Sequence, residues 1–245
     1  MCTVTYLPLA SVGFVLTSTR DERSIRKPAI PPLEYNVHGG KVLYPRDPDA
    51  GGTWIASAIG GYSLCLLNGG FKIHESRPPY RLSRGLVLLD FYKYNNVASF
   101  RDHYDFKVIE PFTLLIIGHL QRSLDELRWD GQKIHHIMPN PDIPGIWSSV
   151  TLYSDDVISM RKDWFDTWLG KNPGFTDIEA VEFHKKAGTG DMHNDVMMDR
   201  EGEVRTVSIT SVFRNTMSEK IYYEDVITGK YFNQNISGNP LLVTQ

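Results

Sequence analysis

The fold is decided by MCTVTYLPLASVGFVLTSTRDE, residues 1–22, which contains two runs of β-branched and aromatic residues. These runs, residues 3–7 and 13–18, have the composition of strands. The segment between them contains Pro8, and Gly13 follows at the start of the second run, so regular structure is interrupted there. The pattern predicts an antiparallel hairpin, and we expect the chain to open on two paired strands.

Beyond this hairpin, the sequence predicts strands and helices in separate runs. The charged and proline-rich region 26–52 reads as loop, with one edge strand at 41–44. Because such segregated runs favour layered α+β structure over alternating βαβ units, we expect a single α+β domain over residues 1–245. The predicted strands are 53–57, 62–67, 112–117, 124–129, 133–137, 205–213, 220–223 and 230–232, and the predicted helices are 83–94, 96–104, 154–169 and 176–183.

Composition excludes several classes of function. The 245 residues include 26 basic and 29 acidic side chains, for a formal net charge of −3, and no basic run is long enough to follow a phosphate backbone. Nucleic acid is therefore not an expected partner. With only two cysteines, no export signal and no apolar stretch long enough to span a bilayer, we expect a cytoplasmic protein without disulfides or a transmembrane segment.

A cysteine at position 2 carries specific chemistry. Removal of Met1 would leave a thiol and a free α-amine on one residue. An α-amine has a pKa of about 7.7–8.0, so near neutral pH a large share of it is unprotonated and able to accept the thiol proton. Cys2 is therefore a candidate nucleophile.

Three further residues suit the supporting roles. The guanidinium of Arg20 would lower the thiol pKa, and the carboxylate of Asp21 would hold the α-ammonium group. Adjacent strand residues point to opposite faces, so both reach Cys2 only where the strand ends or bulges, and residues 23–28 favour such an ending. Asn68 closes the apolar strand 62–67 and is a candidate oxyanion donor.

These residues resemble the signature of the NRDE family, also called the transport-and-Golgi-organisation protein family. More distantly, the sequence is similar to conjugated bile acid hydrolases and penicillin V acylases, whose N-terminal cysteine cleaves a linear amide. The resemblance implies a four-layer αββα sandwich of two antiparallel sheets, of the N-terminal nucleophile (Ntn) hydrolase kind. The motifs that carry it are Met1-Cys2-Thr3, Thr19-Arg20-Asp21-Glu22, Gly51-Gly52-Thr53-Trp54 and Leu67-Asn68.

The resemblance assigns further roles. It places Arg205 as the downstream arginine of the site, while Ser148-Ser149 stand where the family has a Ser-Asn pair and Thr19 replaces the family's Asn. The missing amide removes one expected donor to the oxyanion or the substrate. The implied catalytic residues are Cys2, Arg20, Asp21, Asn68 and Arg205, and the implied substrate-binding residues are Thr19, Trp54 and Ser149.

Two functions remain open from the sequence. The first is a hydrolase or acyltransferase that acts on a linear amide or thioester through Cys2. The second is a binding or carrier protein that holds an apolar ligand such as haem, an acyl thioester or a lipid on the same scaffold. We expect a small-molecule partner, no cofactor and no metal ion, and we leave a homo-oligomer open.

Three residues outside these motifs also stand out. Cys65 alternates with apolar neighbours in a predicted strand and reads as a core residue. Trp164 and Trp168 lie one helical turn apart, which favours core or interface packing. An acyl-binding pocket is the alternative interpretation of the two tryptophans.

Overall fold

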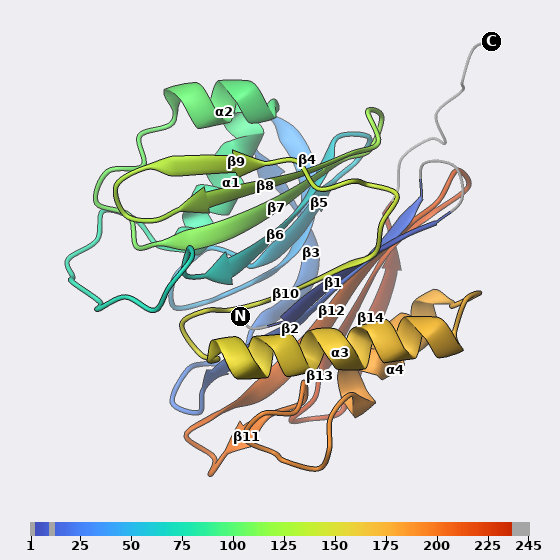
Figure 1. The fold of residues 1–245 in the computed structure, drawn as a ribbon. Helices are drawn as coiled ribbons and strands as arrows, with labels where there is room; N and C mark the ends of the chain where they lie inside the picture. The colour runs from blue at the N-terminus through green and yellow to red at the C-terminus, as the bar shows by residue number, and fades with distance from the viewer. Residues whose placement is uncertain (1–2, 10–12, 237–245) are drawn as a thin grey trace.

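The structure is a computed structural model that describes residues 3–9 and 13–236 (Figure 1). Its strands form two antiparallel sheets. The first sheet has the order β10 (Gly145–Ser148), β1 (Thr3–Pro8), β2 (Phe14–Arg23), β12 (Val204–Arg214), β13 (Glu219–Asp225) and β14 (Lys230–Asn235), with β11 (Asp199–Arg200) paired to β12. The second has the order β3 (Ile30–Val37), β4 (Gly40–Arg46), β5 (Ile55–Ala58), β6 (Tyr62–Asn68), β7 (Phe112–Gly118), β8 (Ser123–Trp129) and β9 (Ile134–Ile137).

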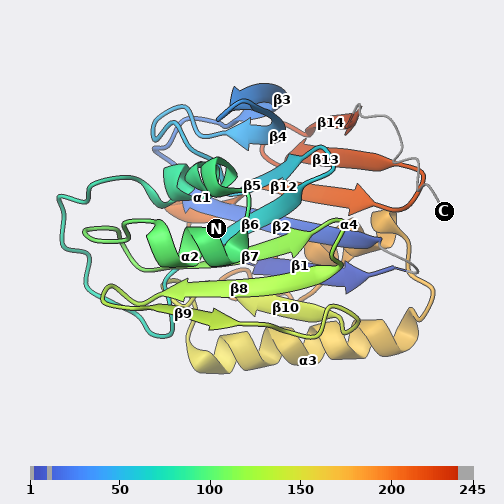
Figure 2. The ribbon, with the colours of Figure 1, turned by 90° about the horizontal axis from the view of Figure 1, so that it is seen from above.

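Four helices cover the outer faces of the two sheets. The second sheet is covered by α1 (Arg84–Tyr94) and α2 (Val97–His103), and the first by α3 (Asp155–Lys171) and α4 (Asp177–Lys186) (Figure 1). Helix α3 runs alongside β10 at the edge of its sheet (Figure 2). The predicted four-layer αββα sandwich is thereby confirmed. None of the helices among the described residues combines the length and the apolar character that crossing a membrane requires.

The apolar side chains form one core cluster at each interface between layers. The middle cluster lies between the sheets and includes Val4 and Leu16, whereas Leu7 and Val15 belong to the cluster beneath α3 and α4. A third cluster joins α1 and α2 to the second sheet. On β1 and β2, even-numbered side chains therefore face the opposite sheet and odd-numbered side chains face the helices, as strand geometry requires.

Strand β2 is central to the first sheet and carries the arginine and the aspartate of the candidate site. It pairs with β1 on one side and with β12 on the other, and Thr3 lies opposite Thr19. The ladder between β2 and β12 shifts its register between Thr206 and Ser208. This irregularity lies beside Asp21, which is opposite Thr206.

The interpretation of region 26–52 as loop with one edge strand was wrong in part. Residues 30–37 form β3, the terminal strand of the second sheet, and its ladder with β4 is irregular between Ile30 and Leu33. An edge strand accommodates Pro31 and Pro32 at such an irregularity because a proline there removes no required ladder hydrogen bond. The short strand β10 was also not predicted, since its four residues carry no pattern of their own.

Candidate active site

The first described residue of β1, Thr3, is held by two other elements. Its backbone N–H donates to the Thr19 hydroxyl on β2 at 3.2 Å, and its own hydroxyl accepts a hydrogen bond from Arg161 of α3. Thr3 is fully buried. Cys2 lies outside the described residues.

Arg20 lies on the face of β2 that meets the second sheet. Its guanidinium donates to Asp47 at 2.8 Å and to Glu22 at 3.3 Å, and it lies 4.9 Å from the centre of the Trp54 ring. Only 2% of the residue is exposed. Trp54 is also buried and contributes to the core between the sheets. Arg20 is thus a buried cation compensated by two carboxylates.

Asp47 remains ionised because several donors surround it. Burial by itself raises the pKa of its carboxyl group, but the backbone N–H of Ala50 and the guanidinium groups of Arg26 and Arg20 outweigh that effect and hold the pKa below its ordinary value. Arg26 donates to Asp47 at 2.7 Å. The carboxylate is therefore negative at neutral pH and fixes the position of Arg20.

Asp21 lies on the opposite face of β2, beneath the helices. Tyr153 donates its hydroxyl proton to Asp21 Oδ2 at 2.6 Å, and Thr206 donates to Oδ1 at 2.6 Å. Because β2 stays regular as far as Arg23, consecutive side chains alternate, and Arg20 and Asp21 do not converge on one point. The strand ends only after Arg23, so its end does not bring the Arg20 and Asp21 side chains to the same face.

A buried arginine links Thr3 to this aspartate, and sequence reasoning missed it. Arg161 is fully buried, donates to the backbone carbonyls of Asn194 and Asp195, and stacks on the Tyr153 ring at 3.7 Å. The sequence did contain a signal for Arg161. This arginine lies four residues before the buried Phe165, on the same face of α3, and a charged residue on an apolar face needs polar partners. Tyr153 lies in the loop before α3 and carried no signal.

A second buried group from the helix layer contacts β1. His184 of α4 lies with its Nε2 2.8 Å from the Thr5 hydroxyl and is completely buried. Burial and the nearby Arg161 charge lower the pKa of this histidine to about 3. His184 is consequently neutral at physiological pH and acts as a hydrogen-bonding partner without charge.

Asn68, the last residue of β6, and Ser149, which directly follows β10, meet although they lie 81 residues apart. The Ser149 hydroxyl donates to the backbone carbonyl of Asn68 at 2.8 Å and lies 2.9 Å from the hydroxyl of Thr151. Gly69 turns the chain here with a φ of +86°, and a Cβ at this position would lie 2.5 Å from Val150. The end of β6 is therefore fastened to the loop that follows β10.

Arg205 lies opposite Glu22 on β12, so the two side chains share a face of the sheet with Arg20. Its Nε atom is buried without a hydrogen-bond partner among the described residues, and the same holds for Nε1 of Trp54. Apart from the pair Asn68 and Ser149, the described site residues that were predicted therefore fall into two sets. Arg20, Trp54 and Arg205 lie on the side of the second sheet, whereas Thr19 and Asp21 lie on the side of the helices.

The other thiol of the chain lies in the core. Cys65 is fully buried between the sheets, and burial raises the pKa of its thiol to about 12. It is thus protonated and inert near neutral pH. Among residues 3–9 and 13–236, no three His, Cys, Asp or Glu side chains are grouped so that they could hold a metal ion.

Solved structures of amide hydrolases share this architecture. Two variants of a conjugated bile acid hydrolase from Clostridium perfringens match with TM-scores of 0.63 and 0.62 at 10% and 12% sequence identity, each over 96% of this chain and 92% of that chain. A Caenorhabditis elegans ortholog of N-acylethanolamine-hydrolyzing acid amidase matches with a TM-score of 0.50 at 13% identity, over 86% of this chain and 92% of that chain. At these identities the likeness establishes the fold, which is that of the Ntn hydrolases.

The sequence itself places the chain in a family. No curated protein sequence matches it. The family model described as Transport and Golgi organisation 2 matches residues 1–171, which include β1, β2, β6 and all of α3. The chain therefore belongs to the Transport and Golgi organisation 2 family.

Proposed function

We propose that this protein is an N-terminal cysteine hydrolase or acyltransferase that acts on a linear amide or a thioester, with Cys2 as the nucleophile after removal of Met1. The observation that carries the proposal is the buried polar setting of Thr3. Thr19, Arg161 and, through Tyr153, Asp21 form one hydrogen-bonded and stacked network around the start of β1. Buried polar groups are costly unless they are hydrogen-bonded, and a fully bonded network holds its members in one geometry, as a catalytic strand end needs.

In the proposed reaction, the α-amine of Cys2 takes the thiol proton and the thiolate attacks the carbonyl carbon of the substrate. The C–N or C–S bond then breaks, and the protonated α-amine returns its proton to the leaving group. Water or an acceptor amine attacks the resulting thioester and releases the acyl group, and the thiol is regenerated. Asp21 is the carboxylate that would hold the α-ammonium group, and its orientation is fixed by Tyr153 and Thr206.

Asn68 is the proposed oxyanion donor. Its backbone is fixed by the hydrogen bond from Ser149, and among the described residues no hydrogen bond ties up its side-chain amide. A preorganised donor of this kind stabilises the negative charge that develops on the carbonyl oxygen. Arg20 and Arg205 would supply positive charge from the face between the sheets.

Hydrolysis of a panel of fluorogenic N-acyl amides and acyl thioesters tests this function. Wild type is expected to release the leaving group, Cys2→Ala to release none, and Cys65→Ala to retain the rate because Cys65 is buried and protonated. Cys2→Ala that keeps the wild-type rate would exclude the proposed nucleophile. Equal stability of the variants in urea serves as the control for folding.

A binding or carrier function is the second proposal, and one observation favours it. Ser149 has a single hydroxyl proton and donates it to the Asn68 carbonyl, so it does not replace the amide donor that the related hydrolases have at this position. A site with fewer oxyanion donors binds a carbonyl ligand but turns it over slowly. The ligand would be apolar, such as an acyl thioester, a lipid or haem.

Native mass spectrometry separates the two proposals. Wild type and Cys2→Ala are incubated with a medium-chain acyl thioester and desalted. A non-covalent complex that persists in both proteins at equal occupancy supports the carrier function. Loss of the ligand from both, together with turnover by wild type, supports the enzyme.

A further inference from the structure

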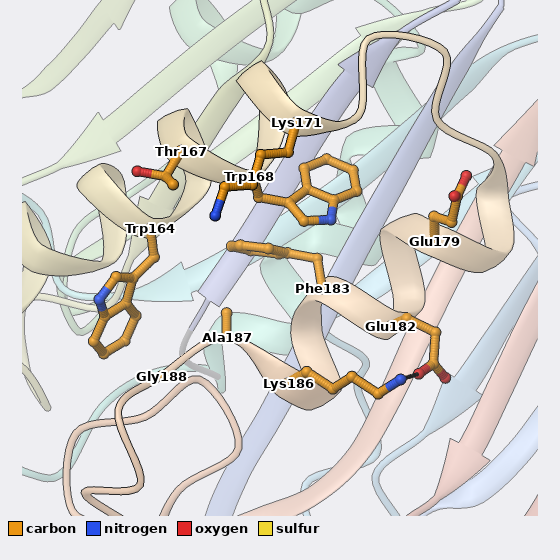
Figure 3. A pocket seen from close by; sticks show the side chains of 10 residues that line it. All are labelled: Trp164, Thr167, Trp168, Lys171, Glu179, Glu182, Phe183, Lys186, Ala187 and Gly188. Atoms are coloured by element: carbon orange, nitrogen blue, oxygen red, sulfur yellow. Dashed lines mark ion pairs between the residues drawn. The ribbon is translucent and has the colours of Figure 1, made fainter.

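A groove outside the candidate active site lies between the last turns of α3 and helix α4 (Figure 3). Its volume of about 340 Å³ is within the range that small organic ligands occupy. None of its lining residues is one of the candidate active-site residues described above. Its lining includes three aromatic side chains and four charged ones.

Three aromatic side chains form the walls of the groove. Trp164 and Trp168 project from α3 and Phe183 projects from α4, as Figure 3 shows. Trp168 packs on Phe183 with ring centres 5.3 Å apart, which fixes the orientation of that wall. Both tryptophans are only partly buried, so their remaining surface faces the groove. Rigid aromatic walls of this kind favour a flat apolar ligand.

The charges at the rim select the sign of the ligand. Glu182 is neutralised by Lys186 at 2.6 Å and by Lys185 at 3.7 Å. Glu179 accepts hydrogen bonds from the backbone and hydroxyl of Thr176, 2.8 and 2.9 Å away, and caps α4. Both carboxylates are therefore already engaged within the protein.

Glu179 keeps its negative charge, which its hydrogen bonds with Thr176 direct to the start of α4. Among the described residues, Lys171 is the cation of the rim that no carboxylate neutralises. It is exposed at the end of α3 and lines the groove, and within residues 3–9 and 13–236 no carboxylate pairs with it. A cation beside an aromatic groove complements a ligand that has a flat apolar body and one negative group. We propose that the groove between α3 and α4 binds a small aromatic carboxylate, with its ring against Trp164, Trp168 and Phe183 and its carboxylate on Lys171.

Isothermal titration calorimetry with 2-naphthoate tests the site, and 2-naphthamide serves as the neutral analogue of the same shape. The naphthoate is expected to bind one site per chain and more tightly than the amide. Lys171→Glu should weaken naphthoate binding about tenfold and leave the amide unchanged, because it reverses one exposed charge. Trp164→Ala should weaken binding of both compounds.

Lys162→Glu is the matched control, since it makes the same change of charge on an exposed residue of the same helix, outside the groove. The proposal is overturned if naphthoate shows no saturable binding, if naphthoate and naphthamide bind equally, or if Lys162→Glu weakens binding as much as Lys171→Glu. It is also overturned if sedimentation shows a dimer that Trp164→Ala converts to monomer, because a second copy would then occupy the groove. Because Cys2 is not involved, these results are independent of whether the chain is an enzyme.

Discussion

Two fully buried histidines predict a loss of stability in mild acid. His184 contacts Thr5, His119 contacts Ser63 at 2.9 Å, and burial, together with a nearby arginine, lowers the pKa of each to about 3. In the unfolded chain both regain a pKa of about 6.5. Because the unfolded state then binds more protons, the free energy of unfolding falls as pH drops below about 6.5, and it keeps falling until about pH 3.

The size of the effect follows from those values. Between pH 8 and pH 5, each histidine removes about 2 kcal/mol from the free energy of unfolding, so both together remove about 4 kcal/mol. Burial raises the pKa of Glu219, which works in the opposite direction, and the lowered pKa of Asp47 acts only in stronger acid. The histidines therefore dominate this pH window.

Urea denaturation at pH 8 and pH 5 measures the effect. His184→Gln and His119→Gln should each be less stable at pH 8 but should lose about 2 kcal/mol less than wild type between the two pH values. His38→Gln, at a partly exposed histidine, should follow the wild type. A wild-type protein equally stable at both pH values, or variants with the full wild-type pH dependence, would refute the reasoning.

Three further predictions concern the site and its supports. Tyr153→Phe removes a hydrogen-bond donor from the buried carboxylate of Asp21 and should lower the free energy of unfolding in urea by about 1.5–3 kcal/mol. An unchanged midpoint of urea denaturation would show that this hydrogen bond does not stabilise the fold. Gly52→Ala would place a Cβ 2.4 Å from the Gly85 backbone and should lower the free energy of unfolding in urea by more than about 2 kcal/mol. Gly170→Ala, with open space around it, is the control and should leave the free energy of unfolding unchanged or raise it. Asn68→Ala should lower acyl-transfer turnover by about 10²–10³-fold with little change in stability, and an unaffected rate would remove Asn68 from the oxyanion site.

Local patterns were sufficient to predict most of the fold. The hairpin of residues 1–22, the strands of the second sheet from β4 to β9 and all four helices carry strong composition or periodicity, and each was predicted close to its observed bounds. The misses were β3, β10 and the two-residue β11. These strands are defined by their pairing partners, so no pattern within the strand itself could reveal them.

The site was harder to predict because its supports lie far apart in sequence. Arg20 and Asp21 were identified from a contiguous motif, but that motif does not reveal that they face opposite layers. Arg161 reaches Thr3 across 158 residues, and Tyr153 reaches Asp21 across 132. Such contacts arise only when the helix layer packs on the first sheet, which the linear sequence does not encode locally.

The most direct measurement is N-terminal peptide mass spectrometry of the purified protein after exposure to one equivalent of an acyl thioester probe. The account predicts that Met1 is absent and that the acyl mass is found on the peptide beginning with Cys2, while the peptide containing Cys65 stays unmodified. A chain that keeps Met1, or a processed Cys2 that remains unacylated under conditions where the probe is consumed, would contradict the assignment of Cys2 as the nucleophile.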